Sequence, residues 1–146
     1  MPEIKLSNRE LRYIGLFETL TGAIVKDCII DERYNRVIFV VRPEDVGLAI
    51  GRGGEKVNQL KNMMKINVEI VSYAETPEDM IKASLMPARV KSVRIVNNPI
   101  GEKVAQVVVD PNDFAVAIGP KGRNINRARI LAKRYFDISN VYITSS

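Results

Sequence analysis

The chain has 146 residues and a net charge of +5, and its 46% hydrophobic and 27% charged positions exclude a disordered or collagen-like protein. It contains no His and one cysteine, Cys28, which excludes Ser-His-Asp and Cys-His catalytic pairs, imidazole metal sites, disulfides within the chain and Cys-x-x-Cys sites. We therefore expect no enzyme activity, no metal and no cofactor, and the basic excess favours a polyanionic partner.

The start of the chain and its hydropathy bear on where the protein acts. Residues Met1–Lys5 are charged and lack the apolar run of a signal peptide. No apolar stretch approaches the roughly 18 residues that a membrane helix needs. The absence of disulfides fits a reducing compartment. We expect a cytoplasmic protein with no membrane partner.

The first half of the chain predicts a helix, a hairpin, two further helices and a strand. Ser7 and Glu10 have the spacing of a capping box, and apolar residues then recur at helical intervals. Ala23–Ile30 and Arg36–Val41 are typical of strands joined by a polar turn. The elements predicted next are a short helix from Pro43 to Gly51, a helix over about Glu55–Met64 and a strand over Ile66–Val71.

The second half repeats this order. Thr76 can cap a helix that begins at Pro77, a position that favours proline, and Pro87 ends it. The elements predicted next are the strands Val90–Val96 and Val104–Val109, a short helix, a helix to about Tyr135 and a strand near Val141–Thr144. Each half thus has the order helix, strand, strand, helix, helix, strand, which predicts an α+β fold with a three-stranded sheet packed on helices.

An internal repeat supports this division. The segment PEDVGLAIGRGG begins at Pro43 and the segment PNDFAVAIGPKG begins at Pro111, a constant offset of 68 residues. Pro, Asp, Ala, Ile and the two outer glycines recur in both segments. Two half-length domains explain the repeat better than one domain with coincidental similarity, and we place them at residues 1–73 and 74–146.

The glycine turn in each copy joins the end of one helix to the start of the next. Its first glycine can take the left-handed conformation that ends a helix, and its last lacks a Cβ, so another backbone can approach closely. The amides that begin the next helix carry the positive end of its dipole, which favours a phosphate. Arg52 and Lys121 place a cation in the same turns. Each turn therefore suits a sugar-phosphate backbone.

Alternative explanations of the turn are weaker. Either copy alone could be an ordinary helix-turn-helix with incidental charge, because Gly-x-x-Gly is common. Two copies, each preceded by Ala-Ile, favour a functional role. Neither copy has the Walker A spacing, and a dinucleotide fingerprint would need a strand directly before the glycines.

Basic residues follow the second turn. Between Gly119 and Phe136 there is no acidic residue, and the six cations are Lys121, Arg123, Arg127, Arg129, Lys133 and Arg134. At about 100° per residue, Arg123, Arg127 and Arg134 share one helical face. The opposite face is apolar and consists of Ala128, Leu131, Ala132 and Tyr135. We expect an apolar core face and a positive outer face; a merely solvated basic face is the alternative.

Aromatic residues make up only 6% of the chain and there is no Trp, so base stacking on aromatic rings is not expected to dominate binding. Cys28 and the aromatic residues Tyr13, Phe17, Phe39 and Phe114 are expected in the core. Asp45 and Asp113 occupy matching positions near the start of the short helices, which favours a role at the helix dipole over catalysis.

The chain resembles a tandem pair of KH domains over nearly its whole length, with Ala49–Gly54 and Ala117–Gly122 as the signature. The order of elements resembles the type II arrangement. The length, the tandem pair and the segment Leu48–Val57 also resemble the archaeal NusA family of transcription elongation and termination factors.

The resemblance implies a narrow groove beside each turn that holds about four unpaired nucleotides, with their backbone on the turn and their bases on an apolar floor. Ile50 and Ile118 would help to line the groove, and Arg52 and Lys121 would meet phosphates. The RNA-binding residues that we expect are Ile50, Gly51, Arg52, Gly53, Gly54, Lys56, Ile118, Gly119, Pro120, Lys121, Gly122, Arg123 and Arg127.

The favoured function is a transcription factor that binds single-stranded nascent RNA through both turns and acts in elongation, termination or antitermination. RNA polymerase is a further candidate partner. One alternative keeps RNA binding but places it in ribosome assembly or translation, where KH domains also occur. Another is a protein-interaction scaffold for RNA polymerase.

Overall fold

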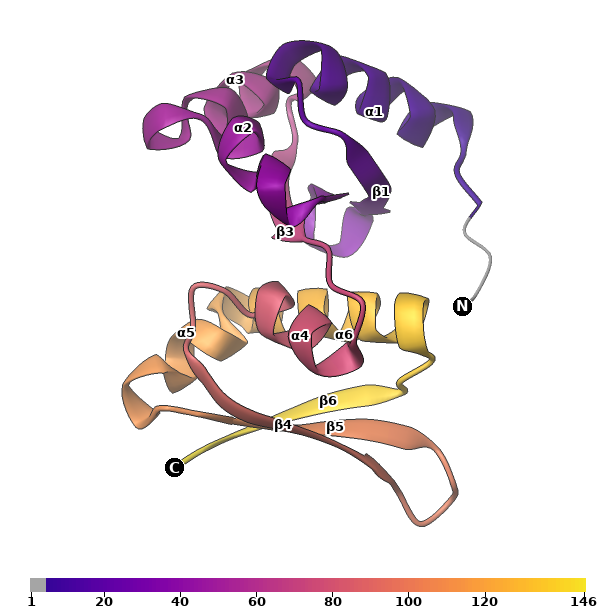
Figure 1. Ribbon diagram of the computed structural model, residues 1–146, viewed down its shortest axis with the longest axis vertical. Coiled ribbons are helices and arrows are strands. Elements are labelled where there is room, and N and C mark those ends of the chain that lie inside the picture. The colour runs from indigo at the N-terminus through magenta and orange to yellow at the C-terminus, as the bar shows by residue number, and fades with distance from the viewer. Residues whose placement is uncertain (1–4) are drawn as a thin grey trace. The chain divides into compact units, whose positions relative to one another are not determined.

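The computed structural model describes residues 5–146 and divides them into two compact units, one over residues 5–73 and one over Ala74–Ser146. Each unit is described by itself (Figure 1). Residues 1–4, which hold most of the charged start, lie outside the described residues. No helix over residues 5–146 has the length and apolar character that would let it cross a membrane.

The first unit has the predicted order of elements, and their bounds agree with the predicted ones within about two residues except at the start of α2. They are α1 (Asn8–Thr21), β1 (Val25–Asp31), β2 (Arg36–Val41), α2 (Val46–Ile50), α3 (Glu55–Met64) and β3 (Asn67–Ser72). The predicted capping box is confirmed. The Glu10 N–H donates to Ser7 Oγ at 3.2 Å, and the Ser7 N–H donates to Glu10 Oε1 at 2.9 Å. The segment Pro43–Asp45, expected to begin the short helix, is a 3-10 turn that leads into α2.

The second unit repeats the order. Its elements are α4 (Pro77–Ser84), β4 (Val90–Asn97), β5 (Lys103–Val109), α5 (Phe114–Ile118), α6 (Arg123–Phe136) and β6 (Asn140–Ser145). Thr76 caps α4 as predicted, because its Oγ1 accepts the Asp79 N–H at 3.2 Å. Pro77 takes the first position of the helix.

Both sheets have the same topology, and it determines where the glycine turns lie. The middle strand pairs antiparallel with the first strand and parallel with the last, in the orders β1-β2-β3 and β4-β5-β6. Parallel neighbours need a crossover connection, and α2 with α3, or α5 with α6, supplies it. Each glycine turn is thus the midpoint of a crossover. The predicted α+β class and three-stranded sheets are confirmed.

Each unit has its own apolar core between sheet and helices. In the first unit the core includes Cys28 and the rings of Phe17 and Phe39, whose centroids are 4.2 Å apart. In the second unit the predicted inner face of α6 contributes Ala128, Leu131, Ala132 and Tyr135, all buried. The prediction that Phe114 lies in the core is wrong: its side chain on α5 is 38% exposed.

The spacing between equivalent residues of the two units is not constant. Val25 and Val90 both pair with the last residue of the middle strand, and they are 65 residues apart. The offset is 68 at Gly51 and Gly119, and 73 at Asn67 and Asn140, which begin the last strands. The β4–β5 turn is longer than the β1–β2 turn, and α6 has 14 residues where α3 has 10.

Candidate nucleic-acid interface

The first glycine of each turn has a backbone conformation that side chains do not tolerate. Gly51 has φ 77° and ψ 173°, and Gly119 has φ 77° and ψ 168°. This region is essentially restricted to glycine. The predicted positive φ is present, but ψ is extended rather than helical, so the chain leaves the short helix abruptly.

Within the protein, a close backbone approach occurs at the first glycine of each turn, and the approach of another backbone to the last glycine stays a prediction. A Cβ on Gly51 would lie 2.9 Å from the backbone nitrogen of Lys56, and a Cβ on Gly119 would lie 2.9 Å from that of Asn124. A Cβ on Gly54 would meet only Asn58 Nδ2, at 3.8 Å. The first glycine packs against the start of the following helix. The absence of its side chain therefore makes room for the backbone of that helix.

The last two residues of each turn are left-handed. Gly54 and Gly122, with φ of 78° and 79°, take the N-cap positions of α3 and α6 and provide no capping side chain to the first-turn amides. The residue before each of them is also left-handed: Gly53 has φ 62° and Lys121 has φ 55°. A side chain in this conformation costs about 1 kcal/mol, so Lys121 is held there by its surroundings.

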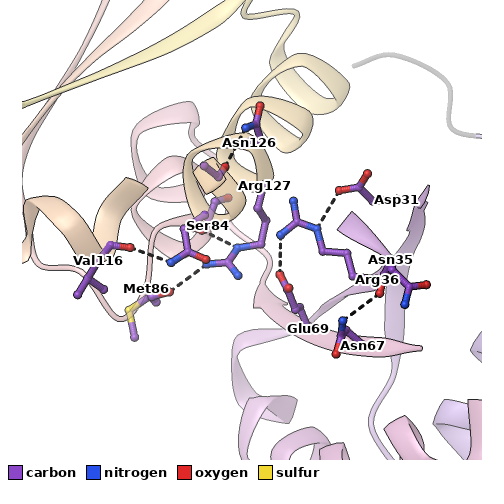
Figure 2. A network of polar contacts seen from close by, with 12 residues as sticks. Asp31, Asn35, Arg36, Asn67, Glu69, Ser84, Met86, Val116, Asn126 and Arg127 are labelled. Carbon is purple, nitrogen blue, oxygen red and sulfur yellow. Dashed lines mark hydrogen bonds and ion pairs between the residues drawn. The ribbon is translucent and has the colours of Figure 1, made fainter. Parts of the chain in front are cut away.

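Side-chain amides of α6 hold the second turn in place. Asn124 Nδ2 donates to the Val116 carbonyl oxygen on α5 at 2.8 Å, and Asn126 Nδ2 donates to the Gly122 carbonyl oxygen at 2.8 Å (Figure 2). The Gly122 N–H donates to the Gly119 carbonyl oxygen at 3.1 Å, as the Gly54 N–H does to that of Gly51 at 3.2 Å. Both turns are therefore ordered within the protein alone.

Cationic and apolar side chains are exposed around each turn. Arg52 and Lys121 are exposed at the turns, and Lys56, Ile118 and Arg123 are partly buried. The short helices expose large apolar side chains, between 37% and 53% accessible: Leu48, Ile50, Phe114 and Val116. The alanine that precedes the isoleucine in each helix, Ala49 or Ala117, is fully buried. An apolar surface thus adjoins a cation in both units.

Sequence reasoning missed three of these side chains, namely Leu48, Phe114 and Val116. A signal for two of them was present in the repeat. In Leu-Ala-Ile and Val-Ala-Ile the small middle residue can face the core of a five-residue helix, which turns both large neighbours outward.

Arg127 does not belong to the exposed site, and its predicted place on the outer face of α6 is wrong. Arg127 is only 9% exposed. Its Nε donates to the Ser84 carbonyl oxygen at 2.8 Å, and its Nη2 donates to the Met86 carbonyl oxygen at 3.0 Å (Figure 2). Those carbonyls end α4 and follow it, where a helix leaves acceptors without intrahelical partners. The guanidinium satisfies them, so Arg127 faces α4.

Arg129 and Lys133 also contact acceptors within the unit. Arg129 Nε and Nη2 both donate to the Val141 carbonyl oxygen at 3.2 Å, and Lys133 Nζ pairs with Asp137 at 2.7 Å. The hydrogen bond and charge of Asp137 raise the pKa of Lys133, and the same pair lowers the pKa of Asp137. The positive surface of α6 is thus narrower than its sequence predicts.

Asp45 and Asp113 each accept a hydrogen bond from a backbone amide outside their short helix, and the expected role at the helix dipole stays a prediction. Asp45 Oδ2 accepts the Ile24 N–H at 2.9 Å, and Asp113 Oδ2 accepts the Arg89 N–H at 2.8 Å. These amides immediately precede β1 and β4. The backbone hydrogen bonds, helped by Arg42 and Arg89, hold the pKa of both carboxyls below the usual range. Within residues 5–146, no group of three or more potential ligands could hold a metal ion.

The fold and the doubled turn define a tandem KH protein, and family models agree. A KH domain model matches residues 11–99, and a model of the NusA-like second KH domain matches residues 77–145. The predicted KH architecture is confirmed.

Individual proteins carry the similarity further. The chain is 40% identical over 138 residues to the probable transcription termination protein NusA of Halococcus morrhuae, covering 94% of this chain and 96% of that protein. It is 38% identical to the protein of the same name from Halobacterium salinarum, covering 97% and 99%. The crystal structure of APE1850 superposes with a TM-score of 0.84 at 34% identity, covering 95% of this chain and 100% of that one. The chain belongs to the NusA family, in its archaeal form.

Proposed function

We propose that the protein is a transcription factor that binds single-stranded nascent RNA through its two glycine turns and acts in elongation, termination or antitermination. The observation that carries this proposal is the repeated turn. In both units, a short helix with exposed apolar side chains leads to a glycine-only conformation, an exposed cation and a helix start without a capping side chain. Apolar side chains suit bases, and amides with a cation suit phosphates.

The proposed site follows from this arrangement, with one residue removed and three added. Arg127 is removed because its guanidinium binds carbonyls of its own unit. The proposed RNA-binding residues are Leu48, Ile50, Gly51, Arg52, Gly53, Gly54 and Lys56, with Phe114, Val116, Ile118, Gly119, Pro120, Lys121, Gly122 and Arg123. Each of the two units, divided between residues 73 and 74, would be one KH domain with one groove.

Replacing the two middle residues of a turn by Asp-Asp tests the proposal. We expect Arg52→Asp with Gly53→Asp, and Pro120→Asp with Lys121→Asp, each to weaken binding of an unstructured oligoribonucleotide at least tenfold by fluorescence anisotropy. The variants should fold, because Asp tolerates the left-handed position better than most residues and Lys121 already occupies it. Binding should also weaken as salt rises.

A matched control separates the turn from net charge. Asn8→Asp with Arg12→Asp changes the charge by the same three units at exposed positions of α1. It should change affinity far less than either turn variant does. Equal losses in the control and the turn variants, or unchanged affinity in both turn variants, would contradict the proposal.

We also propose that the protein acts in the cytoplasm and has RNA polymerase as a further partner, and that it has no catalytic role. The names of the two relatives from Halococcus morrhuae and Halobacterium salinarum support transcripts as the target. Crosslinking in cells distinguishes the alternatives: leader or terminator transcripts support this proposal, whereas ribosomal RNA indicates ribosome assembly or translation. Co-purification with polymerase that survives nuclease, without affinity for free RNA, would indicate a scaffold.

A further inference from the structure

The sheet of the second unit has one face that no helix of that unit covers. The helices α4–α6 lie on one side of β4, β5 and β6, and the other side is open (Figure 1). We call it the open face. It forms a depression of about 360 Å³, lined by Ser92, Arg94, Gln106, Val107, Val108, Tyr142 and Thr144.

The strand register places the polar side chains of the open face in two rows. Arg94 pairs with Gln106, and Gln106 pairs with Tyr142, so one residue from each strand forms the first row. Ser92, Val108 and Thr144 form the second row in the same way. Because neighbouring strands are about 4.8 Å apart, a guanidinium, an amide and a phenol ring stand side by side. Tyr142 is 49% exposed.

The chemistry of the first row suits an unpaired nucleotide. An exposed ring can stack a base, a guanidinium can bind a phosphate or stack on a second base, and amide or hydroxyl groups can bond base edges. No carboxylate lines the depression, and over residues 5–146 Arg94 forms no ion pair. The unit carries 11 basic and 7 acidic side chains, so its charge complements a polyanion.

The first unit shows that the fold does not require such a face. By the strand pairings, Arg94, Gln106 and Tyr142 correspond to Ile29, Ile38 and Glu69. The second row corresponds to Asp27, Val40 and Val71. None of these six side chains is an aromatic ring, a cation or an amide. The exposed ring, cation and amide are therefore particular to the second unit.

We propose that the open face is a second RNA contact, which stacks and holds one or two unpaired nucleotides apart from the glycine turns. This inference rests on the proposed function in taking RNA as the ligand. Tyr142 provides the stacking surface, Arg94 the phosphate contact, and Gln106 with Ser92 and Thr144 the polar contacts to the bases.

A single tryptophan tests the contact directly. The chain has no Trp, so the Tyr142→Trp variant has a single tryptophan, and its tryptophan emission comes from the open face alone. Titration with a 20-nucleotide oligoribonucleotide of mixed A and C should quench this fluorescence strongly, because a stacked base contacts the indole. Ile100→Trp, at the exposed β4–β5 turn, is the matched control and should change little.

Affinity measurements complete the test. Tyr142→Ala should weaken binding about fivefold or more by anisotropy, Tyr142→Phe should retain it, and Arg94→Glu should weaken it and reduce its salt dependence. Circular dichroism should show both alanine and glutamate variants folded. RNA binding with no quenching at position 142 and no loss in Tyr142→Ala would overturn the inference. A different result would contradict the proposed function but support the open face as an RNA contact. In that result, RNA quenches the fluorescence at position 142 while both Asp-Asp turn variants bind RNA normally.

Discussion

The two glycine turns have the same backbone conformation, but their charged residues lie at different positions. In the first turn Arg52 precedes a left-handed glycine, and Glu55 begins the next helix. In the second turn Lys121 itself takes the left-handed position, and Arg123 begins the helix. The comparison shows that the outer glycines determine the shape of the turn while the charge is free to vary. We expect the second turn to attract phosphate more strongly, because it has two cations and no carboxylate.

The largest expected effect concerns what the turns share. Gly51→Ala should destabilise the protein by about 2–3 kcal/mol, because the new Cβ would lie 2.9 Å from the Lys56 backbone nitrogen at a combination of φ and ψ that is essentially restricted to glycine. Urea unfolding measures the loss. Gly47→Ala, four residues earlier in α2 with nothing within 4 Å, is the control and should be neutral or slightly stabilising. Similar losses in both variants would show that the first glycine has no special role.

A smaller effect should distinguish the helices that follow the turns. Arg127→Met removes the donors to the Ser84 and Met86 carbonyls and should cost about 1–3 kcal/mol in urea unfolding, with RNA affinity of the folded protein retained. The equivalent residue of α3 is the exposed Gln59, and Gln59→Met should change stability little. Weaker RNA binding by Arg127→Met at unchanged stability would restore the original interpretation of Arg127 as an RNA contact.

The smallest effect is expected when the residues Lys121 and Gly53 are exchanged between the two turns. Lys121→Gly should weaken RNA binding a few-fold and lower the salt slope of log K by about 0.7, the value for one phosphate contact on a single strand. The same change should raise stability by up to about 1 kcal/mol, because it relieves a side chain at φ 55°. Gly53→Lys should do the reverse in the first unit, with tighter binding and lower stability. Loss of affinity in both variants would mean that the turns are not interchangeable.

The repeat and the element order could be predicted because they depend on local signals. Alternating β-branched residues, capping residues such as Ser7 and Thr76, and the doubled Gly-x-x-Gly each act over a few neighbouring positions. These signals are enough for the topology, since a short crossover between parallel strands leaves few arrangements. The exposed position of Arg52 and Lys121 follows from the same signals.

Features that depend on tertiary partners could not be predicted in the same way. A helical wheel places Arg127 beside Arg123 and Arg134, but it holds no information on the α4 carbonyls that receive the guanidinium. Phe114 was expected inside because it is aromatic, yet α5 has five residues and its buried side is filled by Ala117. The close contact at Gly51 depends on how the chain returns from α2 to α3, which spacing alone does not show.

The uneven spacing of the two units indicates where the chain tolerates a change in length. The extra residues of the second unit lie in the β4–β5 turn and in α6 after the glycines, whereas exactly ten positions separate Val41 from Gly51 and Val109 from Gly119. A label inserted at the hairpin tip near Ile100 would leave the turn where it is. Deleting one residue between Val41 and Leu48 would rotate α2 by about 100° against its strand and swing Leu48 and Ile50 away from their present direction.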